Sequence, residues 1–454
     1  MRHVTDSRRR GLVALTVCVA ALVACVRGFF SPVVPVLPEV IESPSPRLAS
    51  RVLWIVVDGL RHDTALESGW MPQLEGLARR GASGTAMTTA ITMTGVGVRA
   101  MSTGMSPSLA DLARNWSLPR VTDDNLFARI KARGGRAVAL GNETWFQLFP
   151  DMLAKATNRR PGIIKFASPV NGFDRFLTKR ALELAGDKSW ELAVLHFGGV
   201  DNASHMWTPS SEKFHDKITE IDTDLGRIAA EMGPHTTLLI TSDHGTSDRG
   251  HHGGIDPVER RTPLVLVGPG IRRGASLDAR QVDLPATVAA LLGLQVSAPV
   301  EGRALVEALD LTLSDGDALI ASEARRHDRY ANAYATQFSE PPRPAGVELA
   351  DWLATARARW LAPLLWALAM IAAAAWLFGL SRGAPRVERW LSLAIVIAAI
   401  GSAVVSVAPV PLAAIALVGL LVPLLPWLDE VRHRLRPTTL VVIALAAAQT
   451  AALL

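Results

Sequence analysis

Cysteine is almost absent from this chain of 454 residues, because only Cys18 and Cys25 occur and both lie in one apolar run near the N-terminus. A disulfide framework and a thiolate metal site are therefore excluded from the long middle of the chain. Any metal bound there must be held by Asp, Glu, His or hydroxyl groups.

The middle of the chain also lacks a basic excess, although the whole chain carries a formal charge of +5. Residues 1–30 contribute +4 and residues 382–436 contribute +3, so everything else sums to −2. A nucleic-acid-binding surface has no support in this composition. The positive charge flanks apolar runs instead.

Charged residues and histidine are missing from four long apolar runs in the last hundred residues, at 361–380, 390–408, 411–428 and 438–454. Their lengths are close to the ~20 residues that a transmembrane helix needs. Two Arg-rich loops, 381–389 and 429–436, alternate with an uncharged turn at 408–412, as the positive-inside rule requires. The pattern predicts four transmembrane helices, and the absence of intramembrane charge argues against a transporter.

A shorter apolar run, residues 11–26, follows the basic stretch Ser7–Arg10. Two interpretations stay open: an uncleaved membrane anchor, or a secretory signal. The second is supported by the stretch Leu22–Cys25, which resembles a lipoprotein processing box with Cys25 as the acylated residue. Under both, residues 31–358 lie on the extracytoplasmic side of a cell membrane that the chain crosses several times.

Residues 31–50 are rich in Pro and Ser and read as a linker. Short apolar runs typical of buried parallel strands follow, at Val52–Val57, Arg136–Leu140, Leu192–Phe197, Thr237–Thr241 and Leu264–Val267. Helical patterns lie between them, most clearly at 212–232, which Gly233-Pro234 ends. We therefore expect an α/β domain with a mostly parallel central sheet and helices on both faces.

These boundaries predict five parts of the chain. They are an anchor or signal at 1–30, the linker at 31–50, the α/β domain at 51–310, a juxtamembrane helical region at 311–358 and the four transmembrane helices at 359–454.

Acidic residues and histidines follow three of the predicted strands. They are Asp58, then Asp201 with His205, and then Asp243-His244 with His251-His252 shortly after. Ligands of such folds lie beyond the carboxyl ends of the strands. An Asp-Gly after a strand is usually only a turn, but the joint occurrence of all these groups indicates a Zn²⁺ or Mn²⁺ site.

The same stretches resemble the alkaline-phosphatase superfamily, and within it the branch of phosphodiesterases and glycosylphosphatidylinositol ethanolamine-phosphate transferases. The matching stretches cover roughly residues 50–305. They are Val57–Asp63, Thr92–Thr94 with Arg99–Gly104, Gly141–Pro150, His196–Asp201, Ser242–Gly245 with His252–Gly254, and Val282–Gly293. The stretch Gly141–Pro150 is the most specific to this branch. The resemblance implies that 51–310 is a catalytic domain with an alkaline-phosphatase-like fold.

The resemblance also implies two divalent metal ions, zinc first and manganese as the alternative. One ion would be held by Asp58, Asp243, His244 and the oxygen of a nucleophilic Thr94. The other would be held by Asp201, His205 and His252, with His251 less favoured because the family histidine directly precedes Gly-Gly. Thr92 is the alternative nucleophile. His62 and His196 could support the ligands, and Asn202 and Ser204 depart from the family's His and Gly.

These implications favour an enzyme that moves a phosphoethanolamine-like group from a phospholipid donor to a glycan or lipid acceptor through a phospho-threonine intermediate. The alternative is a metal-dependent phosphodiesterase or phosphatase, with water as the acceptor. A sulfatase is disfavoured because the Cys/Ser-x-Pro-x-Arg context of the formylglycine route is missing at Thr94. A non-enzymatic membrane scaffold is disfavoured because every ligand position is filled.

Overall fold

The computed structural model describes residues 34–37, 46–89, 91–108, 111, 114–115, 117–155 and 172–359. Within these ranges no helix combines the length and the apolar character needed to cross a bilayer. The predicted anchor or signal at 1–30, part of the linker and the four apolar runs after residue 360 lie outside the described residues. Residues 34–344 form one compact unit.

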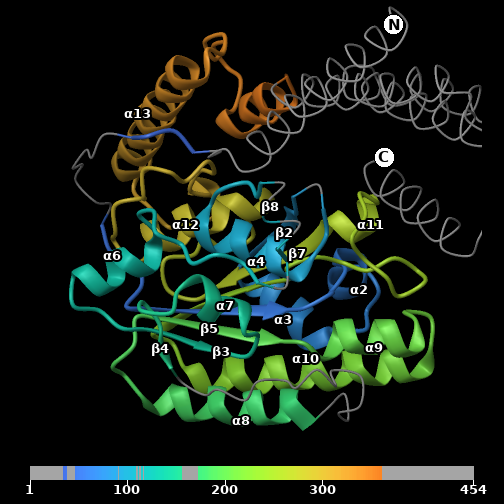
Figure 1. The fold of residues 1–454 in the computed structure, drawn as a ribbon. Coiled ribbons are helices and arrows are strands. Elements are labelled where there is room, and N and C mark those ends of the chain that lie inside the picture. The colour runs from blue at the N-terminus through green and yellow to red at the C-terminus, as the bar shows by residue number, and fades with distance from the viewer. Residues whose placement is uncertain are drawn as a thin grey trace, which may run out of the picture. The chain divides into compact units, whose positions relative to one another are not determined.

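A single mixed sheet organises this unit (Figure 1). Its eight strands in the described ranges are β1 Arg51–Val57, β2 Ala82–Met87, β3 Ala137–Leu140, β4 Ala154–Lys155, β5 Leu192–Phe197, β6 Thr236–Thr241, β7 Arg261–Val267 and β8 Ser276–Arg280. Their order is β4-β3-β5-β1-β6-β7-β2-β8. Only β7 runs against its neighbours β6 and β2. The predicted mostly parallel sheet is therefore confirmed.

Helices cover both faces of the sheet, as predicted (Figure 1). One face packs against α2 His62–Leu66, α3 Pro72–Arg80, α8 Gly172–Gly186, α9 Gly199–Trp207 and α10 Glu212–Met232. The other packs against α4 Thr94–Thr103, α6 Leu126–Ala132, α7 Thr144–Leu148 and α12 Leu284–Leu291. Further elements are α11 Pro257–Arg260, α13 Leu313–Phe338 and the 3₁₀ turns Gln281–Asp283 and Val306–Ala308, and the described residues 349–359 are helical as well.

Strand β1 runs through the middle of the hydrophobic core. Val52, Trp54 and Val56 enter one of two apolar clusters, and the alternate residues between them enter the other. This alternation follows from the period of two in a strand. Because both faces are covered, β1 is apolar almost throughout, which is why its position was evident from the sequence.

Helix α10 has the bounds that its periodicity predicted. The side chain of Ser211 caps it by accepting a hydrogen bond from the Phe214 N–H, and Gly233 ends it with a φ of 68°.

On the buried side of α10, the Lys217 ammonium lies 2.6 Å from Asp174 of α8. This buried pair packs directly beneath Gly199, where an added Cβ would lie 1.9 Å from Asp174 Oδ2. It supports the start of α9.

The three strands that precede predicted ligands, β5, β1 and β6, are adjacent in the sheet and parallel. Their carboxyl ends therefore lie side by side at one edge.

Candidate active site

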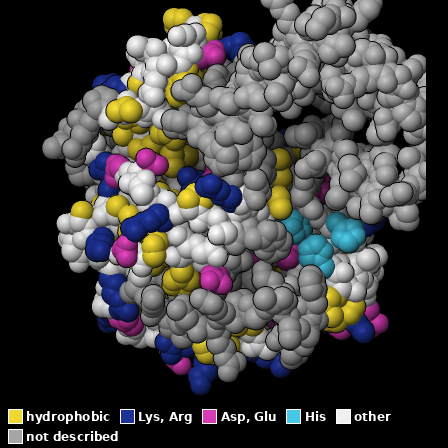
Figure 2. Space-filling view, in the orientation of Figure 1, with side chains coloured by type: hydrophobic (Ala, Val, Ile, Leu, Met, Phe, Trp, Pro, Cys, Tyr) yellow, Lys and Arg dark blue, Asp and Glu magenta, His cyan; other side chains and the backbone are white. Residues whose placement is uncertain are grey.

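The three predicted aspartates come together where β5, β1 and β6 end. The ligand atoms of Asp58, Asp201 and His244 all lie within 4.8 Å of one another, as do those of Asp58, His196 and Asp243. Side chains separated by up to 186 positions, from Asp58 to His244, thus share one site because their strands are neighbours. Figure 2 shows histidine side chains gathered at one place on the surface.

A glycine makes this convergence possible. Gly59 follows Asp58 with a φ of +76°, and a Cβ added to it would lie 2.9 Å from the Asp201 Cα. The Gly59 N–H also points to Asp243 Oδ1 at 3.3 Å. The turn after β1 therefore touches the backbone and side chains of both other aspartates.

One group of predicted ligands surrounds the Nε2 atom of His244. This nitrogen lies 3.4 Å from Asp58 Oδ1 and 3.6 Å from Asp243 Oδ2. It lies 3.3 Å from the Thr94 hydroxyl. The structure brings together all four residues assigned to the first ion.

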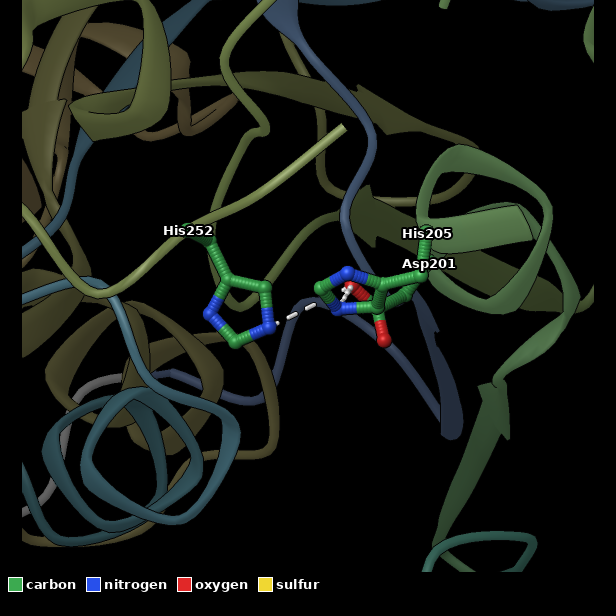
Figure 3. A group of neighbouring side chains, drawn as sticks. All are labelled: Asp201, His205 and His252. Atoms are coloured by element: carbon green, nitrogen blue, oxygen red, sulfur yellow. Dashed lines mark ion pairs between the residues drawn. The ribbon is translucent and has the colours of Figure 1, made fainter. Parts of the chain in front are cut away.

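The second group contains the three residues assigned to the other ion (Figure 3). Asp201 and His205 stand on successive turns of α9, and His252 points at them from the loop after β6. Asp201 Oδ1 lies 3.3 Å from His205 Nε2 and 3.4 Å from His252 Nε2. The neighbouring His251 is exposed, with its ring 5.8 Å from that of His205.

Backbone carbonyls fix the tautomers of two of these histidines. His244 Nδ1 lies 3.0 Å from the Gly245 carbonyl, and His252 Nδ1 lies 2.7 Å from the Thr92 carbonyl. A carbonyl oxygen only accepts, so in both rings Nδ1 donates the hydrogen bond. The Nε2 lone pairs of both neutral rings consequently face the aspartates. This arrangement is typical of histidines that bind metal ions.

The donor set fits divalent cations. A lone pair on His252 Nε2 at 3.4 Å from a carboxylate oxygen places two electron-rich atoms together, which a cation between them makes favourable. The same holds for His244 and Asp58. Within the described part of the chain, the buried Asp243 Oδ2 also accepts no hydrogen bond. Carboxylate oxygens and imidazole nitrogens are ligands that Zn²⁺ and Mn²⁺ share.

Titration of the second group reflects the same crowding. Burial lowers the pKa of His252. Contact with the Asp201 carboxylate raises the pKa of His205. Burial opposes ionisation of Asp201, but its contact with His205 and the nearby His244 and His252 lower its pKa overall.

The two candidate nucleophiles differ in exposure and in hydrogen bonding. Thr94 is partly exposed, at the first position of α4, and its hydroxyl can donate to His244 Nε2. Thr92 is 1% exposed, and its hydroxyl donates to Glu259 Oε2 at 2.7 Å while accepting from the Gly253 N–H at 2.8 Å. Thr92 therefore supports the His252 loop, and the geometry favours Thr94 as the nucleophile.

Other supporting residues were not apparent from the sequence. Gln281 is buried and donates from Nε2 to the carbonyls of Ser242 and Asp243 at 3.0 and 2.7 Å. Ser204, which departs from the family's glycine, donates to the Asp201 carbonyl at 2.8 Å. Asn115 accepts from the Gly95 N–H, next to Thr94. Of these three residues, only Ser204 could have been noticed in the sequence, because it stands where the family has glycine. The contacts of Gln281 and Asn115 join segments that are distant in the chain.

Among known families, residues 52–259 match the model described as type I phosphodiesterase / nucleotide pyrophosphatase. Two curated relatives are the human "GPI ethanolamine phosphate transferase 2, catalytic subunit" and the Aspergillus fumigatus "GPI ethanolamine phosphate transferase 2". The human protein is 29% identical over 290 residues, which cover 58% of this chain and 29% of the relative. The Aspergillus protein is 29% identical over 321 residues, which cover 63% of this chain and 41% of the relative. The chain thus spans well under half the length of both.

Among solved structures, a protein of the alkaline phosphatase superfamily from Vibrio parahaemolyticus aligns over 66% of this chain and 79% of its own, with 18% identity and a TM-score of 0.44. Human ectonucleotide pyrophosphatase / phosphodiesterase 5 aligns over 56% of this chain and 97% of its own, with 14% identity and a TM-score of 0.43.

Proposed function

Since residues 52–259 form a domain of the type I phosphodiesterase / nucleotide pyrophosphatase family, we propose that this chain is a metal-dependent, membrane-bound phosphoryl-group transferase. It moves a phosphoethanolamine-like group from a phospholipid donor to a lipid-linked glycan or lipid acceptor. The two curated relatives named above carry the name ethanolamine phosphate transferase, which supports this choice of group. The catalytic part is the domain at 51–310.

The observation that carries the proposal is the position of Thr94 in the ligand cluster. Its hydroxyl lies 3.3 Å from His244 Nε2, which itself lies 3.4 Å from Asp58 Oδ1. Asp58, Asp243 and His244 would hold one dication with Thr94, and Asp201, His205 and His252 would hold the other. When bound, two such ions lower the pKa of the hydroxyl and neutralise charge on the phosphate.

The chain's own residues then perform two displacements at phosphorus. Thr94 Oγ1 loses its proton and attacks the donor phosphate, and the bond to the diacylglycerol oxygen breaks as that oxygen takes up a proton. The phosphoethanolamine group is now an ester of Thr94. An acceptor hydroxyl attacks the same phosphorus, gives up its proton and restores the free Thr94 hydroxyl.

The second candidate is a phosphodiesterase, in which water replaces the acceptor hydroxyl in the second displacement. The name of the matching family, phosphodiesterase and nucleotide pyrophosphatase, favours it. The same residues would act in both reactions, because only the final nucleophile differs.

The membrane location is part of the proposal and is supported by the sequence. Four uncharged apolar runs follow residue 360, and their Arg-rich loops assign residues 31–358 to the extracytoplasmic side of the cell membrane. A lipid donor and a lipid-linked acceptor would both reach a catalytic domain held at that surface.

The test uses the full chain reconstituted in vesicles that contain phosphatidylethanolamine with an isotope-labelled head group and a glycolipid acceptor. Mass spectrometry follows the label. Label on the acceptor together with diacylglycerol supports transfer, whereas free phosphoethanolamine supports the hydrolase. Thr94→Ala is expected to lose both products, and a Thr94→Ala protein that still forms either product would refute the assignment of the nucleophile.

A further inference from the structure

His196 lies inside the site but is oriented differently from the predicted ligands. It is the penultimate residue of β5, and 1% of it is exposed. The indole N–H of Trp145 donates to its Nδ1 at 3.0 Å. An indole nitrogen can only donate, so His196 Nδ1 carries a lone pair and the proton of the neutral ring is on Nε2.

That Nε2–H group faces Asp58, whose Oδ2 lies 3.3 Å away. In His244 and His252 the proton is on Nδ1 and the lone pair on Nε2 faces the site. His196 therefore presents an N–H where those two rings present a lone pair. Although its ring is close enough to form a ligand group with Asp58 and Asp243, it cannot bind a cation through that nitrogen.

The position of Trp145 is fixed by its packing. Its buried ring packs edge-on against Trp54, with centroids 6.0 Å apart, and against Phe127, with centroids 6.2 Å apart. The chain reaches it through Gly141, where a Cβ would lie 2.2 Å from the His196 carbonyl oxygen. The end of β3 can therefore lie against β5 only with a glycine at that position.

We propose that Trp145 and His196 are positioning residues for Asp58, a role that rests on the proposed metal site. Trp145 sets the tautomer of His196, and the His196 Nε2–H holds Asp58 Oδ2. The other oxygen, Oδ1, is then directed toward His244 Nε2, at 3.4 Å. The Gly141–Pro150 stretch would thus act on the metal site through one hydrogen-bonded relay, without contributing a ligand.

The relay predicts a specific loss of metal affinity. Outer partners that orient a ligand are typically worth about 10- to 100-fold in metal affinity. Trp145→Phe keeps a large aromatic ring but removes the donor, and we expect it to weaken binding of one zinc ion by about tenfold or more. Affinity is measured by chelator competition on the metal-stripped full chain in detergent.

Trp190→Phe is the matched control. Trp190 is also buried, at 1% exposed, and its indole N–H donates to the Leu184 carbonyl at 3.0 Å. It lies in the other apolar cluster from Trp145, so its substitution removes the same group without touching the relay, and both zinc affinities are expected to stay unchanged. Equal effects of the two tryptophan substitutions would overturn the proposal.

Substitutions of His196 keep the test decisive if Trp145→Phe fails to fold. His196→Gln places an amide N–H near the position of Nε2 and is expected to retain most of the affinity, whereas His196→Leu is expected to lose about 10- to 100-fold. A His196→Leu protein with wild-type affinity for both ions would overturn the relay alone. A wild-type protein that binds no zinc or manganese would instead overturn the metal site of the proposed function.

Discussion

At the scale of single residues, the orientation of an imidazole ring separates ligands from supporting groups. His244 and His252 donate from Nδ1 to carbonyl oxygens, which leaves Nε2 for a cation. His251, next to His252 in the chain, is exposed. Its backbone N–H donates to the Ser247 hydroxyl and its carbonyl accepts from the Ser247 N–H, so these bonds do not involve its ring. Two adjacent histidines therefore allow a direct comparison.

His252→Ala is expected to lower the bound metal from two ions per chain to one, because the second group loses one of its three predicted ligands. His251→Ala is the control and is expected to retain both ions. Elemental analysis of the purified full chain measures the metal content. Equal metal content in the two variants would contradict the assignment of His252.

The two threonines are separated by substitution with valine, which has the same shape without a hydroxyl. Thr94→Val is expected to abolish the phosphorylated intermediate, which is detected by acid quenching and peptide mass spectrometry. Thr92→Val is expected to retain labelling at Thr94 but to lower the free energy of unfolding by about 1–3 kcal/mol, because the Gly253 N–H and Glu259 lose a buried partner. Labelled Thr92 in the wild-type protein would refute this assignment.

Six of the seven predicted site residues, all except Thr94, could be proposed from the sequence because they belong to short motifs after predicted strands, whereas Thr94 was chosen from the family resemblance. The hydrogen bonds of Thr92 and Gln281 could not be predicted, because their partners lie 38 to 167 positions away in the chain. For His196 the sequence suggested a supporting role but not its partner Trp145, which lies 51 positions away. A local pattern can indicate that a histidine is present at a strand end. It cannot say which ring nitrogen carries the proton.

At the scale of elements, the turn after β1 determines how closely the aspartates approach. Gly59 has a φ of +76° and packs against Asp201, whereas Gly69 has nearly the same φ, +75°, with nothing within 4 Å of an added Cβ. Substituting alanine at each of these two glycines therefore distinguishes the cost of backbone strain, which both share, from the cost of steric contact, which only Gly59 has.

Gly69→Ala is expected to cost only the strain of a left-handed residue, about 1 kcal/mol. Gly59→Ala carries the same strain and also pushes Asp201 away from Asp58, so we expect both a larger loss of stability and weaker metal binding. Thermal unfolding with and without added zinc measures both effects. If zinc raises the unfolding midpoint of Gly59→Ala as much as that of Gly69→Ala, Gly59 does not position the site.

The sequence predicted β1, β3, β5, β6 and α10 to within one residue, whereas β7 begins three residues earlier than predicted, at Arg261 and not at Leu264. Strands β2, β4 and β8 were not predicted. Strand β2 has the sequence ASGTAM, whose small residues carry no clear apolar pattern. Its Gly84 lies against the Leu277 carbonyl of β8, so the strand is specified by this close approach and not by hydrophobicity.

At the scale of the whole molecule, stability depends on pH through a buried carboxyl between the sheet and α12. Burial raises the pKa of Asp283 to about 6, although its oxygens accept from the Arg280 and Arg303 N–H groups. Its ordinary value is 3.8, so between pH 3.8 and 6 the folded state binds more protons than the unfolded state. Stability from this group therefore falls as pH rises through that window.

We expect the wild-type protein to lose about 2 kcal/mol relative to Asp283→Asn between pH 4 and pH 7. The free energy of unfolding of both metal-stripped proteins in detergent, measured across this range, provides the test. A difference that stays constant with pH, or changes in the opposite direction, would contradict the assignment to Asp283.

The order of ligands along the chain has a consequence for biogenesis. The first aspartate is at position 58 and the last histidine at position 252, so no shorter nascent segment contains the complete set. Their strands β5, β1 and β6 must also pair before the groups approach one another. With the proposed two-ion site on the extracytoplasmic side, capture of the ions would follow translocation and folding of this stretch, so the ions would come from the compartment in which the domain folds and not from the one in which it is synthesised.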